Sequence, residues 1–491
     1  MPSSESSAQY SKATRLLAEA IGTAHVRTDE DTRFAASFDN SRYSFMPDAV
    51  VLPRHEDDVA EVLRLANEYR VPVTVRGAGS GSAGAAAPLH GGWVLHLAHW
   101  NSIEIDSAAS MAYVQPGAIT GEVDVAAAKH GLFYPPDPSS VKYCTIGGNI
   151  ATNAGGLRAA KYGVCRDYVY GLEGFLPTGE FVRWGGPVRK YVSGYNMKDL
   201  WIGSEGTLGV ITKAILKLIP RPTVRHTFLL AFDSDETALE AATALLAEHV
   251  VPSVFEFLDI QTVTCAERRN GFPVFPSADL GTKTPLTPAI LLVEVDGHAA
   301  VVTEDSIRVR TWAQKYALAF RETGDAAEAE KLWNVRRTCS QAMFQLGNAK
   351  LNEDIVVPLR SYVPLIRFTR EIKQRTRLAT PTFGHAADGN FHIHIMYNRD
   401  DADQCRRAEE GIFMMMKKVV ELGGAITGEH GIGITKSPFL RLQHTEAEIN
   451  AMLAIRKALD PNGILSPGQI FDVTSIWNYQ PVKVTLPWDK H

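Results

Sequence analysis

Two segments of the sequence carry residue types that bind metal ions. The segment FGHAADGNFHIHIMYN places His385 and His392 on either side of an Asp-Gly-Asn turn. The alternation after this turn is typical of a strand, so His392 and His394 should share one face. Farther along, GGAITGEHGIGITK sets Glu429 and His430 in a glycine-rich turn. Two histidines and one glutamate are a ligand set of catalytic zinc and manganese sites, and sometimes of iron sites.

The same residues also fit a simpler interpretation. A lone histidine is more often a surface residue or a hydrogen-bonded core residue than a metal ligand. Clustering favours the metal site, but the residue pattern by itself leaves both interpretations open.

A glycine-rich loop follows the strand-like run VPVTVR and contains the spacing G-x-G-x-x-G. A dinucleotide-binding turn of that spacing needs a helix after the loop. Here Pro88 and a Gly-Gly pair interrupt, and the next strand, WVLHL, comes too soon for a crossover helix. What remains are backbone N–H groups, the hydroxyls of Ser80 and Ser82, and Arg76 at the mouth of the loop, which together can cradle a pyrophosphate. The alternative is a flexible surface turn.

The elements that must position these groups fall into three regions. From Asp48 onward β-rich runs alternate with amphipathic helical runs, and a first domain should close near Arg221, where two prolines end a strand-like run. The next region, with FEFLD and AILLVEVDG, predicts an antiparallel sheet covered by helices. After Tyr397 the sequence becomes helical and ends in RKALDPNGILSPGQIF, a tail expected to pack back on the first domain. We therefore expect an α+β fold with domains at residues 1–221, 222–404 and 405–491.

Composition excludes several classes of protein. The 491 residues are 45% hydrophobic and 21% charged, as in ordinary globular proteins, and the net charge of -5 offers no basic field for nucleic acid. The five cysteines form no C-x-x-C pair, which argues against an iron–sulfur or structural zinc motif. No apolar signal core and no apolar run of about 18 residues is found, so we expect a cytoplasmic protein without a membrane span, either free or peripheral at the inner face of the membrane.

Several motifs together resemble one known family. VRGAGSGSAGAAAP, VQPGAITGEV, YPPDPSSVKYCTIGGNIATNAGGLRAAKYGVCRDYVYGLE and LWIGSEGTLGVIT closely resemble the FAD domain of vanillyl-alcohol-oxidase-type flavoproteins. The matching branch contains glycolate oxidase catalytic subunits, D-lactate dehydrogenases and D-2-hydroxyglutarate dehydrogenases. The resemblance spans roughly Asp48 to Phe471. It implies a two-subdomain FAD-binding domain, an antiparallel-sheet cap domain for substrate, and a helical C-terminal segment.

The resemblance also implies a set of FAD contacts. Ser80 stands where members that tether the flavin covalently carry His or Cys, so a non-covalent FAD is expected. The tail reads Ser466-Pro467-Gly468 where the family has N-P-G, which puts a flavin contact from that side chain in doubt. The implied contacts to the pyrophosphate, the ribityl chain, the isoalloxazine and the adenosine come from Arg76, Gly77, Ala78, Gly79, Ser80, Gly81, Ser82, Pro116, Gly117, Thr145, Ile146, Gly147, Gly148, Asn149, Asn153, Gly155, Gly156, Glu205 and Ile211.

The family's H-x-G-D-G-N-x-H and G-E-H-G motifs are matched as well, apart from Ala387 in place of the first motif's glycine. By that match His385, His392 and Glu429 bind a divalent metal, zinc or alternatively manganese or iron, and His430 is the catalytic base. His394 departs from the family's asparagine and would touch substrate or add a ligand. The W-x-x-R arginine is Arg336, implied to clamp the substrate carboxylate. Two residues would assist it, Ser340 one helical turn later and, by a looser alignment, Lys350.

The implied activity is oxidation of a small D-2-hydroxy acid, D-lactate or glycolate, to the 2-oxo acid. Because the sequence has neither an iron–sulfur motif nor a nicotinamide loop, electrons would pass to a quinone, a cytochrome, an electron-transfer flavoprotein or an iron–sulfur subunit. Alternatives are a D-2-hydroxyglutarate dehydrogenase, an ether-lipid synthase of the same superfamily, and a non-catalytic FAD-carrying subunit of an oxidase complex. A homodimer and a hetero-oligomer are both compatible with the sequence.

Overall fold

The computed structural model describes residues 4–281 and 286–473. The chain divides into two compact units, the first built from residues 1–156, 164–220 and 429–491 and the second from residues 157–163 and 221–428. The expected second domain ends at residue 404, whereas the second unit runs on to residue 428. The end of the expected C-terminal segment, residues 474–491, lies outside the described residues.

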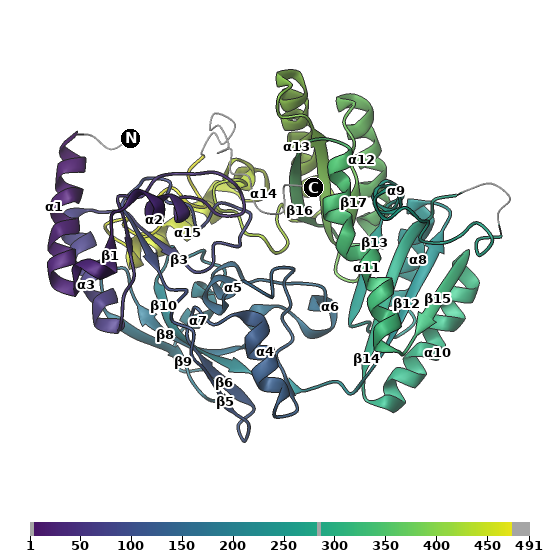
Figure 1. The fold of residues 1–491 in the computed structure, drawn as a ribbon, viewed down its shortest axis with the longest axis horizontal. Helices are drawn as coiled ribbons and strands as arrows, with labels where there is room; N and C mark the ends of the chain where they lie inside the picture. The colour runs from purple at the N-terminus through teal and green to yellow at the C-terminus, as the bar shows by residue number, and fades with distance from the viewer. Residues whose placement is uncertain (1–3, 282–285, 474–491) are drawn as a thin grey trace. The chain divides into compact units, whose positions relative to one another are not determined.

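The first unit begins with a small sheet whose three adjacent parallel strands are bordered by a short antiparallel one (Figure 1). Its order is β1 (Val26–Arg27), β2 (Ala49–Val51), β4 (Trp93–His96), β3 (Val73–Arg76). Helices α1 (Ser4–Ile21) and α3 (Glu56–Tyr69) bury their apolar faces in the same core as this sheet. On α3 the buried positions Val59, Val62, Leu63 and Ala66 recur at helical spacing, which is why this stretch is an amphipathic helix.

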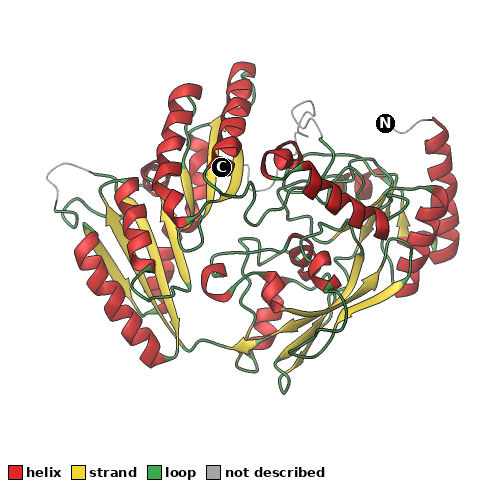
Figure 2. Cartoon of the chain, turned by 180° about the vertical axis from the view of Figure 1, so that it is seen from behind, coloured by secondary structure: helices red, strands yellow, loops and turns green. Residues whose placement is uncertain are grey.

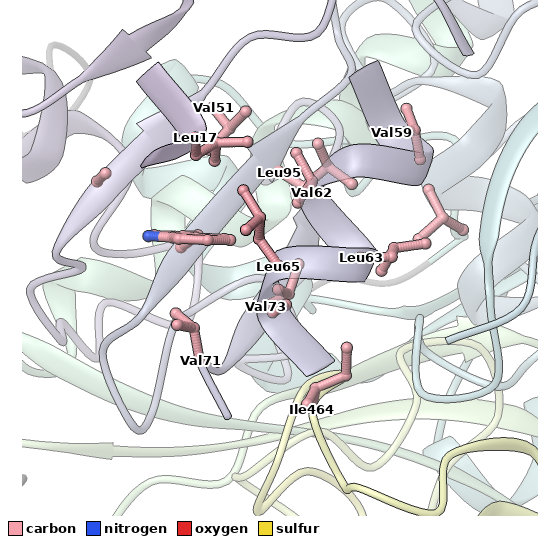
Figure 3. Packing of buried hydrophobic residues seen from close by; sticks show 14 of the residues in the cluster. Leu17, Val51, Val59, Val62, Leu63, Leu65, Val71, Val73, Leu95 and Ile464 are labelled. Carbon is pink, nitrogen blue, oxygen red and sulfur yellow. The ribbon is translucent and has the colours of Figure 1, made fainter. Parts of the chain in front are cut away.

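The C-terminal part of the chain contributes to that core. Ile464 packs in the same apolar cluster as the residues of α3 (Figure 3). Its carbonyl accepts the N–H of Val73 at 2.8 Å, and the N–H of Ser466 donates to the carbonyl of Val73 at 2.8 Å. The tail therefore pairs with strand β3, the strand that leads into the glycine-rich loop.

A second sheet of the first unit is antiparallel throughout. Its order is β5 (Ile103–Asp106), β6 (Met111–Val114), β10 (Val210–Lys217), β8 (Val169–Phe175), β9 (Phe181–Gly185). A two-stranded ribbon pairs β7 (Leu132–Phe133) with β11 (Ile219–Pro220). Besides α1 and α3, the described helices of this unit are α2 (Glu30–Ala35), α4 (Thr120–Ala128), α5 (Ile146–Thr152), α7 (Met197–Trp201), α14 (Leu440–Gln443) and α15 (Glu446–Leu459).

The second unit is a seven-stranded antiparallel sheet with helices on its faces (Figure 2). Its order is β15 (Ala319–Thr323), β12 (Val224–Phe232), β14 (Ala289–Gly297), β13 (Val254–Leu258), β17 (Thr382–His385), β18 (Asn390–Tyr397), β16 (Ala349–Val356). Strand β14 is buried along nearly its whole length, as expected for a strand covered on both faces. The helices are α6 (Ala159–Tyr162), α8 (Asp235–Leu246), α9 (Ile260–Asn270), α10 (Ala299–Tyr316), α11 (Ala326–Ala342), α12 (Tyr362–Thr376) and α13 (Ala402–Glu421).

The helices on one face matter for the site. Residues of α9 and α11, including Val263, Ala266 and Trp333, form an apolar cluster with alternate residues of β12, β13 and β14. The same alternation puts Val254, Glu256 and Leu258 of β13 on the face that α11 covers. These sheets and helices confirm the α+β fold. No helix within residues 4–281 and 286–473 is both long and apolar enough to cross a bilayer.

Candidate functional site

The strand register places several polar residues of the second unit on one face of its sheet. Glu256 of β13 lies directly opposite His385 of β17, and Phe383 lies opposite His392 of β18. Residues directly opposite on neighbouring antiparallel strands point to the same side. Because β18 alternates, His394 also points there, and its partners on β16 continue the row: Asn352 opposite His394, and Asp354 opposite His392.

Glu256 joins two of the expected site residues. Its side chain is fully buried, and its Oε2 accepts a hydrogen bond from Arg336 Nε at 2.5 Å. Its Oε1 bonds His385 Nδ1. Burial alone would raise the pKa of Glu256, but the adjacent His385 and Arg336 outweigh burial and hold the pKa below its usual range. A negative charge therefore sits at the centre of this face.

The three histidines of the segment lie close together. The rings of His385 and His392 are 5.4 Å apart, edge to face, and both side chains are about 95% buried. His394 is also buried, and its Nδ1 lies 3.3 Å from the carbonyl oxygen of Pro381. Because a carbonyl can only accept a hydrogen bond, this contact requires the proton on Nδ1 of His394.

A second buried carboxylate anchors the turn that leads to Glu429. Asp354 accepts from Asn390 Nδ2 at 2.6 Å with one oxygen, and from Thr427 Oγ1 at 3.0 Å and the N–H of Gly428 at 2.9 Å with the other. Gly428 must be glycine, since a Cβ there would lie 2.2 Å from Asn390 Nδ2. The segment before Glu429 is thus fixed to strand β16.

Glu429 follows that anchored turn by one peptide bond. One candidate ligand atom from each of His385, His392 and Glu429 lies within 4.8 Å of the others, a separation that one metal ion can bridge. His430 Nε2 lies 3.7 Å from Glu429 Oε1, and its side chain is 24% exposed. The two adjacent side chains therefore differ in exposure to solvent, and His430 is the more accessible.

The cationic residues expected to bind substrate lie beside this face. Arg336 on α11 stacks over the ring of Phe383, with its guanidinium carbon 4.1 Å from the ring centroid. Lys350 Nζ donates to Ser340 Oγ at 2.8 Å, so these two predicted residues are neighbours. Since Ser340 is one helical turn from Arg336, the three residues form one polar group at the end of α11.

The glycine-rich loop of the first unit packs tightly against two other loops. A Cβ on Gly77 would lie 2.3 Å from Thr145 Oγ1, one on Gly147 would lie 2.7 Å from Pro116, and one on Gly117 would lie 2.4 Å from the carbonyl of Ala98. Glycine lets the backbones of these segments approach each other and any ligand. Thr145 also caps α5 by accepting the N–H of Gly148.

Arg76 and Asn153 contact the protein itself. Arg76 is buried, donates to the carbonyl of Ala86 at 3.2 Å, and has a pKa lowered by burial. Asn153 ends α5 in the left-handed conformation, and its Oδ1 accepts the N–H of Arg166 at 2.9 Å. Both side chains shape the loops, and a direct contact with FAD stays a prediction for each.

Gly155, in the third flavin motif, lies next to the turn that carries Glu429 and the candidate base His430. A Cβ on Gly155 would lie 3.2 Å from Glu429 Oε2, within the same unit. Glu205, expected near the adenosine, is buried and accepts the N–H groups of Ile432 at 2.8 Å and Gly433 at 2.7 Å. Ile211 lies in β10. The structure thus gives Glu205 a backbone-holding role, and the adenosine contacts of Glu205 and Ile211 stay predictions.

Sequence reasoning missed the two buried carboxylates, Glu256 and Asp354. A signal was present in each case. FEFLD places a glutamate between two phenylalanines in a strand, and NEDIVVP leads an aspartate into an apolar run. A buried carboxylate requires a cation or several hydrogen-bond donors, so each one indicated a partner elsewhere in the chain.

Two family models match separate parts of the chain. Residues 47–185 match the family model described as FAD binding domain, and residues 221–470 match the model described as FAD linked oxidases, C-terminal domain. The second match covers half of the chain and includes every histidine of the site.

Curated relatives are similar over most of their length. The chain is 39% identical to the glycolate oxidase subunit GlcD of Bacillus subtilis, covering 89% of this chain and 92% of that protein. It is 34% identical to a D-lactate dehydrogenase of Anaerostipes hadrus, over 86% and 89%. A mitochondrial D-lactate dehydrogenase [cytochrome] of Arabidopsis thaliana is 31% identical, over 91% and 78%.

Solved structures share the fold at low sequence identity. p-Cresol methylhydroxylase matches with a TM-score of 0.77 at 18% identity, covering 95% of this chain and 98% of that one. 4-Ethylphenol oxidase from Gulosibacter chungangensis matches with a TM-score of 0.75 at 19% identity, over 97% and 99%. These likenesses establish the fold alone.

Proposed function

The chain belongs to the FAD-linked oxidase family and is an FAD-linked oxidoreductase, and we propose that it oxidises a small D-2-hydroxy acid to the 2-oxo acid. The names of the relatives support glycolate and D-lactate as the substrate class. The observation that carries the proposal is the sheet face on which Glu256 holds His385 and Arg336 together.

FAD would bind in the first unit. The close approach of the loops around Gly77, Gly117 and Gly147 leaves backbone N–H groups accessible to a pyrophosphate. Ser80 cannot form the tether that a His or Cys would, so FAD is held without a covalent bond. When bound, the flavin supplies the acceptor for the hydride from C2 of the substrate.

A divalent metal ion would bind to His385, His392 and Glu429. Two imidazoles and one carboxylate suit zinc, manganese or iron, and such a set leaves coordination positions for substrate. A bound ion would lower the pKa of the substrate hydroxyl by stabilising the negative charge on its oxygen. The buried carboxylates Glu256 and Asp354 support this proposal, because they fix the directions of the ligand-bearing segments.

The remaining residues would bind and deprotonate the substrate. Arg336 uses Nε for Glu256, so its terminal nitrogens can meet the substrate carboxylate in a bidentate arrangement. Ser340, Lys350 and His394 would contact the substrate. His430, the most accessible histidine of the group, would take the hydroxyl proton and so prepare C2 for oxidation.

The electron acceptor would be a separate molecule, either a quinone, a cytochrome, an electron-transfer flavoprotein or an iron–sulfur subunit. One relative is named a subunit and another carries cytochrome in its name, which supports a protein acceptor. A role in the cytoplasm or at the inner face of the membrane, and assembly as a homodimer or hetero-oligomer, remain predictions.

Anaerobic reduction of the bound flavin tests the proposal. The purified holoprotein is mixed without oxygen with glycolate, D-lactate, L-lactate and D-2-hydroxyglutarate, and the flavin absorbance is followed. We expect rapid bleaching by a small D-2-hydroxy acid and slow bleaching by the L-enantiomer. If none of the acids bleaches the flavin, the protein is a flavin-carrying subunit without this activity.

A further inference from the structure

Glu256 is buried between two groups that the proposed chemistry needs, His385 and Arg336. It is fully buried in strand β13, opposite His385 in register, and bonded to both His385 and Arg336. The carboxylate therefore links a candidate metal ligand to the candidate substrate clamp.

The chemistry of this contact determines which ring nitrogen of His385 can bind a metal. A carboxylate accepts hydrogen bonds and, when ionised, donates none. His385 must then carry a proton on Nδ1, where it meets Glu256 Oε1. The lone pair is left on Nε2, the nitrogen that points away from Glu256.

We propose that Glu256 is a positioning residue that fixes His385 as an Nε2 metal ligand and, through its second oxygen, sets the orientation of Arg336. This inference rests on the proposed function, because it assumes the metal site of His385, His392 and Glu429. Carboxylates that hold a ligating histidine typically change metal affinity by 10- to 100-fold when they are replaced.

Glutamine is the informative replacement at this position. It has nearly the same volume, but it offers one carbonyl oxygen and one NH₂ group. In the observed arrangement each partner bonds a different oxygen, so glutamine can accept from His385 or from Arg336 while its NH₂ group faces the other. Glu256→Gln should leave the ring of His385 and the guanidinium of Arg336 competing for one acceptor.

A neighbouring buried carboxylate provides the matched control. Glu294 lies on the adjacent strand β14, opposite Val254, and accepts from Thr227 Oγ1 at 3.3 Å and Trp333 Nε1 at 3.2 Å. Glu294→Gln makes the same carboxyl-to-amide change in the same sheet, at a residue that bonds Thr227 and Trp333 instead of His385 and Arg336.

The experiment measures zinc affinity of the flavin-loaded protein. Wild type, Glu256→Gln and Glu294→Gln are stripped with a chelator, and Zn²⁺ is titrated in competition with a chromophoric chelator. FAD content per chain reports folding. We expect Glu256→Gln to bind zinc about 10- to 100-fold more weakly than wild type, and Glu294→Gln to stay within about threefold, with FAD content unchanged in both.

The outcomes separate this inference from the proposed function. If wild type binds one zinc and Glu256→Gln binds it equally well, the positioning role is wrong while the metal site stands. If wild type binds no zinc, manganese or iron at stoichiometric level, the metal site itself is wrong and the inference falls with it.

A second measurement applies if Glu256→Gln does not fold. In zinc-loaded wild type with ¹⁵N-labelled histidine, the long-range couplings within each imidazole ring show which ring nitrogen carries the proton. The His385 signal is identified by its absence in His385→Gln. We expect a proton on Nδ1 and the metal on Nε2. Coordination through Nδ1, or a proton on Nε2, would overturn the assignment.

Discussion

Arg336 is the residue whose charge the proposed chemistry uses most directly. Its side chain is 15% exposed, and its guanidinium is held by Glu256 on one side and the ring of Phe383 on the other. Such a group is positioned before substrate arrives, so little side-chain entropy is lost when a carboxylate binds. The neighbouring Arg337 is instead about half exposed and pairs with Glu330 on the same helix.

Arg336→Met should therefore lower kcat/KM for 2-hydroxy acids. The loss should correspond to about 2–5 kcal/mol of transition-state stabilisation, because a buried charge partner of the carboxylate is lost. Arg337→Met is the control and should stay within about threefold of wild type. Steady-state kinetics with D-lactate and glycolate, and with a neutral alcohol of similar size, check this. Equal losses for the acids and the neutral alcohol would refute the carboxylate clamp.

His430 and His385 should have separable roles. His385→Ala removes one of three protein ligands and should empty the metal site. His430→Ala should retain the metal and reduce flavin roughly 10²- to 10⁴-fold more slowly, because a positioned base is lost. Metal analysis and anaerobic stopped-flow reduction on both variants measure this. If His430→Ala loses the metal as fully as His385→Ala, then His430 is a ligand and His394 becomes the next candidate for the base.

At the scale of elements, the flavin loops depend on glycine at positions of close contact. Gly77 follows strand β3 and faces Thr145 at the start of α5. A Cβ on Gly77 would lie only 2.3 Å from Thr145 Oγ1. Gly186, in the same unit, has open space around its Cβ position. Two glycine substitutions in one unit should thus have different consequences.

Gly77→Ala should reduce the FAD content of the purified protein substantially, because either the loop or α5 must shift to admit the methyl group. Gly186→Ala should keep the wild-type FAD content. Absorbance of the flavin per chain measures both. Full FAD content in Gly77→Ala would show that the close approach of Gly77 to Thr145 does not matter.

The turn that carries Glu429 and His430 is held on both sides by buried acids rather than by regular secondary structure. Asp354 holds the turn before Glu429, and Glu205 holds the backbone after it, at Ile432 and Gly433. This arrangement explains how a glycine-rich turn can present Glu429 and His430 in a defined way. A Cβ on Gly431 would also lie 2.9 Å from the Glu205 carboxyl, so the turn and the acid fit closely.

For the whole molecule, Glu205 links stability to pH. Burial raises the pKa of Glu205 to about 7, although two backbone N–H groups and Lys436 oppose the shift. In the unfolded chain a glutamate ionises near pH 4.3. Between these values the folded protein keeps a proton that the unfolded chain releases, so raising the pH favours unfolding.

The contribution of Glu205 to the free energy of unfolding should therefore fall as the pH rises from about 4.5 to 7, by up to about 3 kcal/mol, and stay constant above that range. Melting temperatures measured at one scan rate between pH 5 and 8 test this. Glu205→Gln does not titrate, so its melting temperature should depend less on pH than that of wild type. Parallel curves for the two proteins would contradict the prediction.

Much of the architecture could be predicted from the sequence because local patterns determine it. The helical spacing of apolar residues in α3, the alternation in β18 and the prolines near residue 221 each predict the element that the structure shows. The end of the second unit at residue 428 was not predictable in this way. The helix α13 has no local mark of which sheet it covers, and the pairing of Ala425 with Val356 that follows it is a long-range contact.

For the candidate site, residue types pointed to His385, His392 and Glu429, and the family resemblance added Arg336. The structure brings the ligand atoms of the first three within 4.8 Å of one another, and the roles of all four stay predictions. The roles of Glu256 and Asp354 depend on strand register across segments distant in sequence, which no local pattern gives. Likewise, nothing local in the sequence shows that Glu205 bonds a backbone more than two hundred residues away.

In the proposed function, a bound metal ion and a bound flavin together serve the oxidation of a D-2-hydroxy acid. The rate of anaerobic flavin reduction by D-lactate or glycolate, measured before chelation, after chelation and after adding back Zn²⁺ or Mn²⁺, tests it most directly. We predict that the chelated protein keeps its FAD, is reduced at least about 100-fold more slowly, and recovers when one ion is restored. Reduction at an unchanged rate in fully metal-free protein would contradict the account.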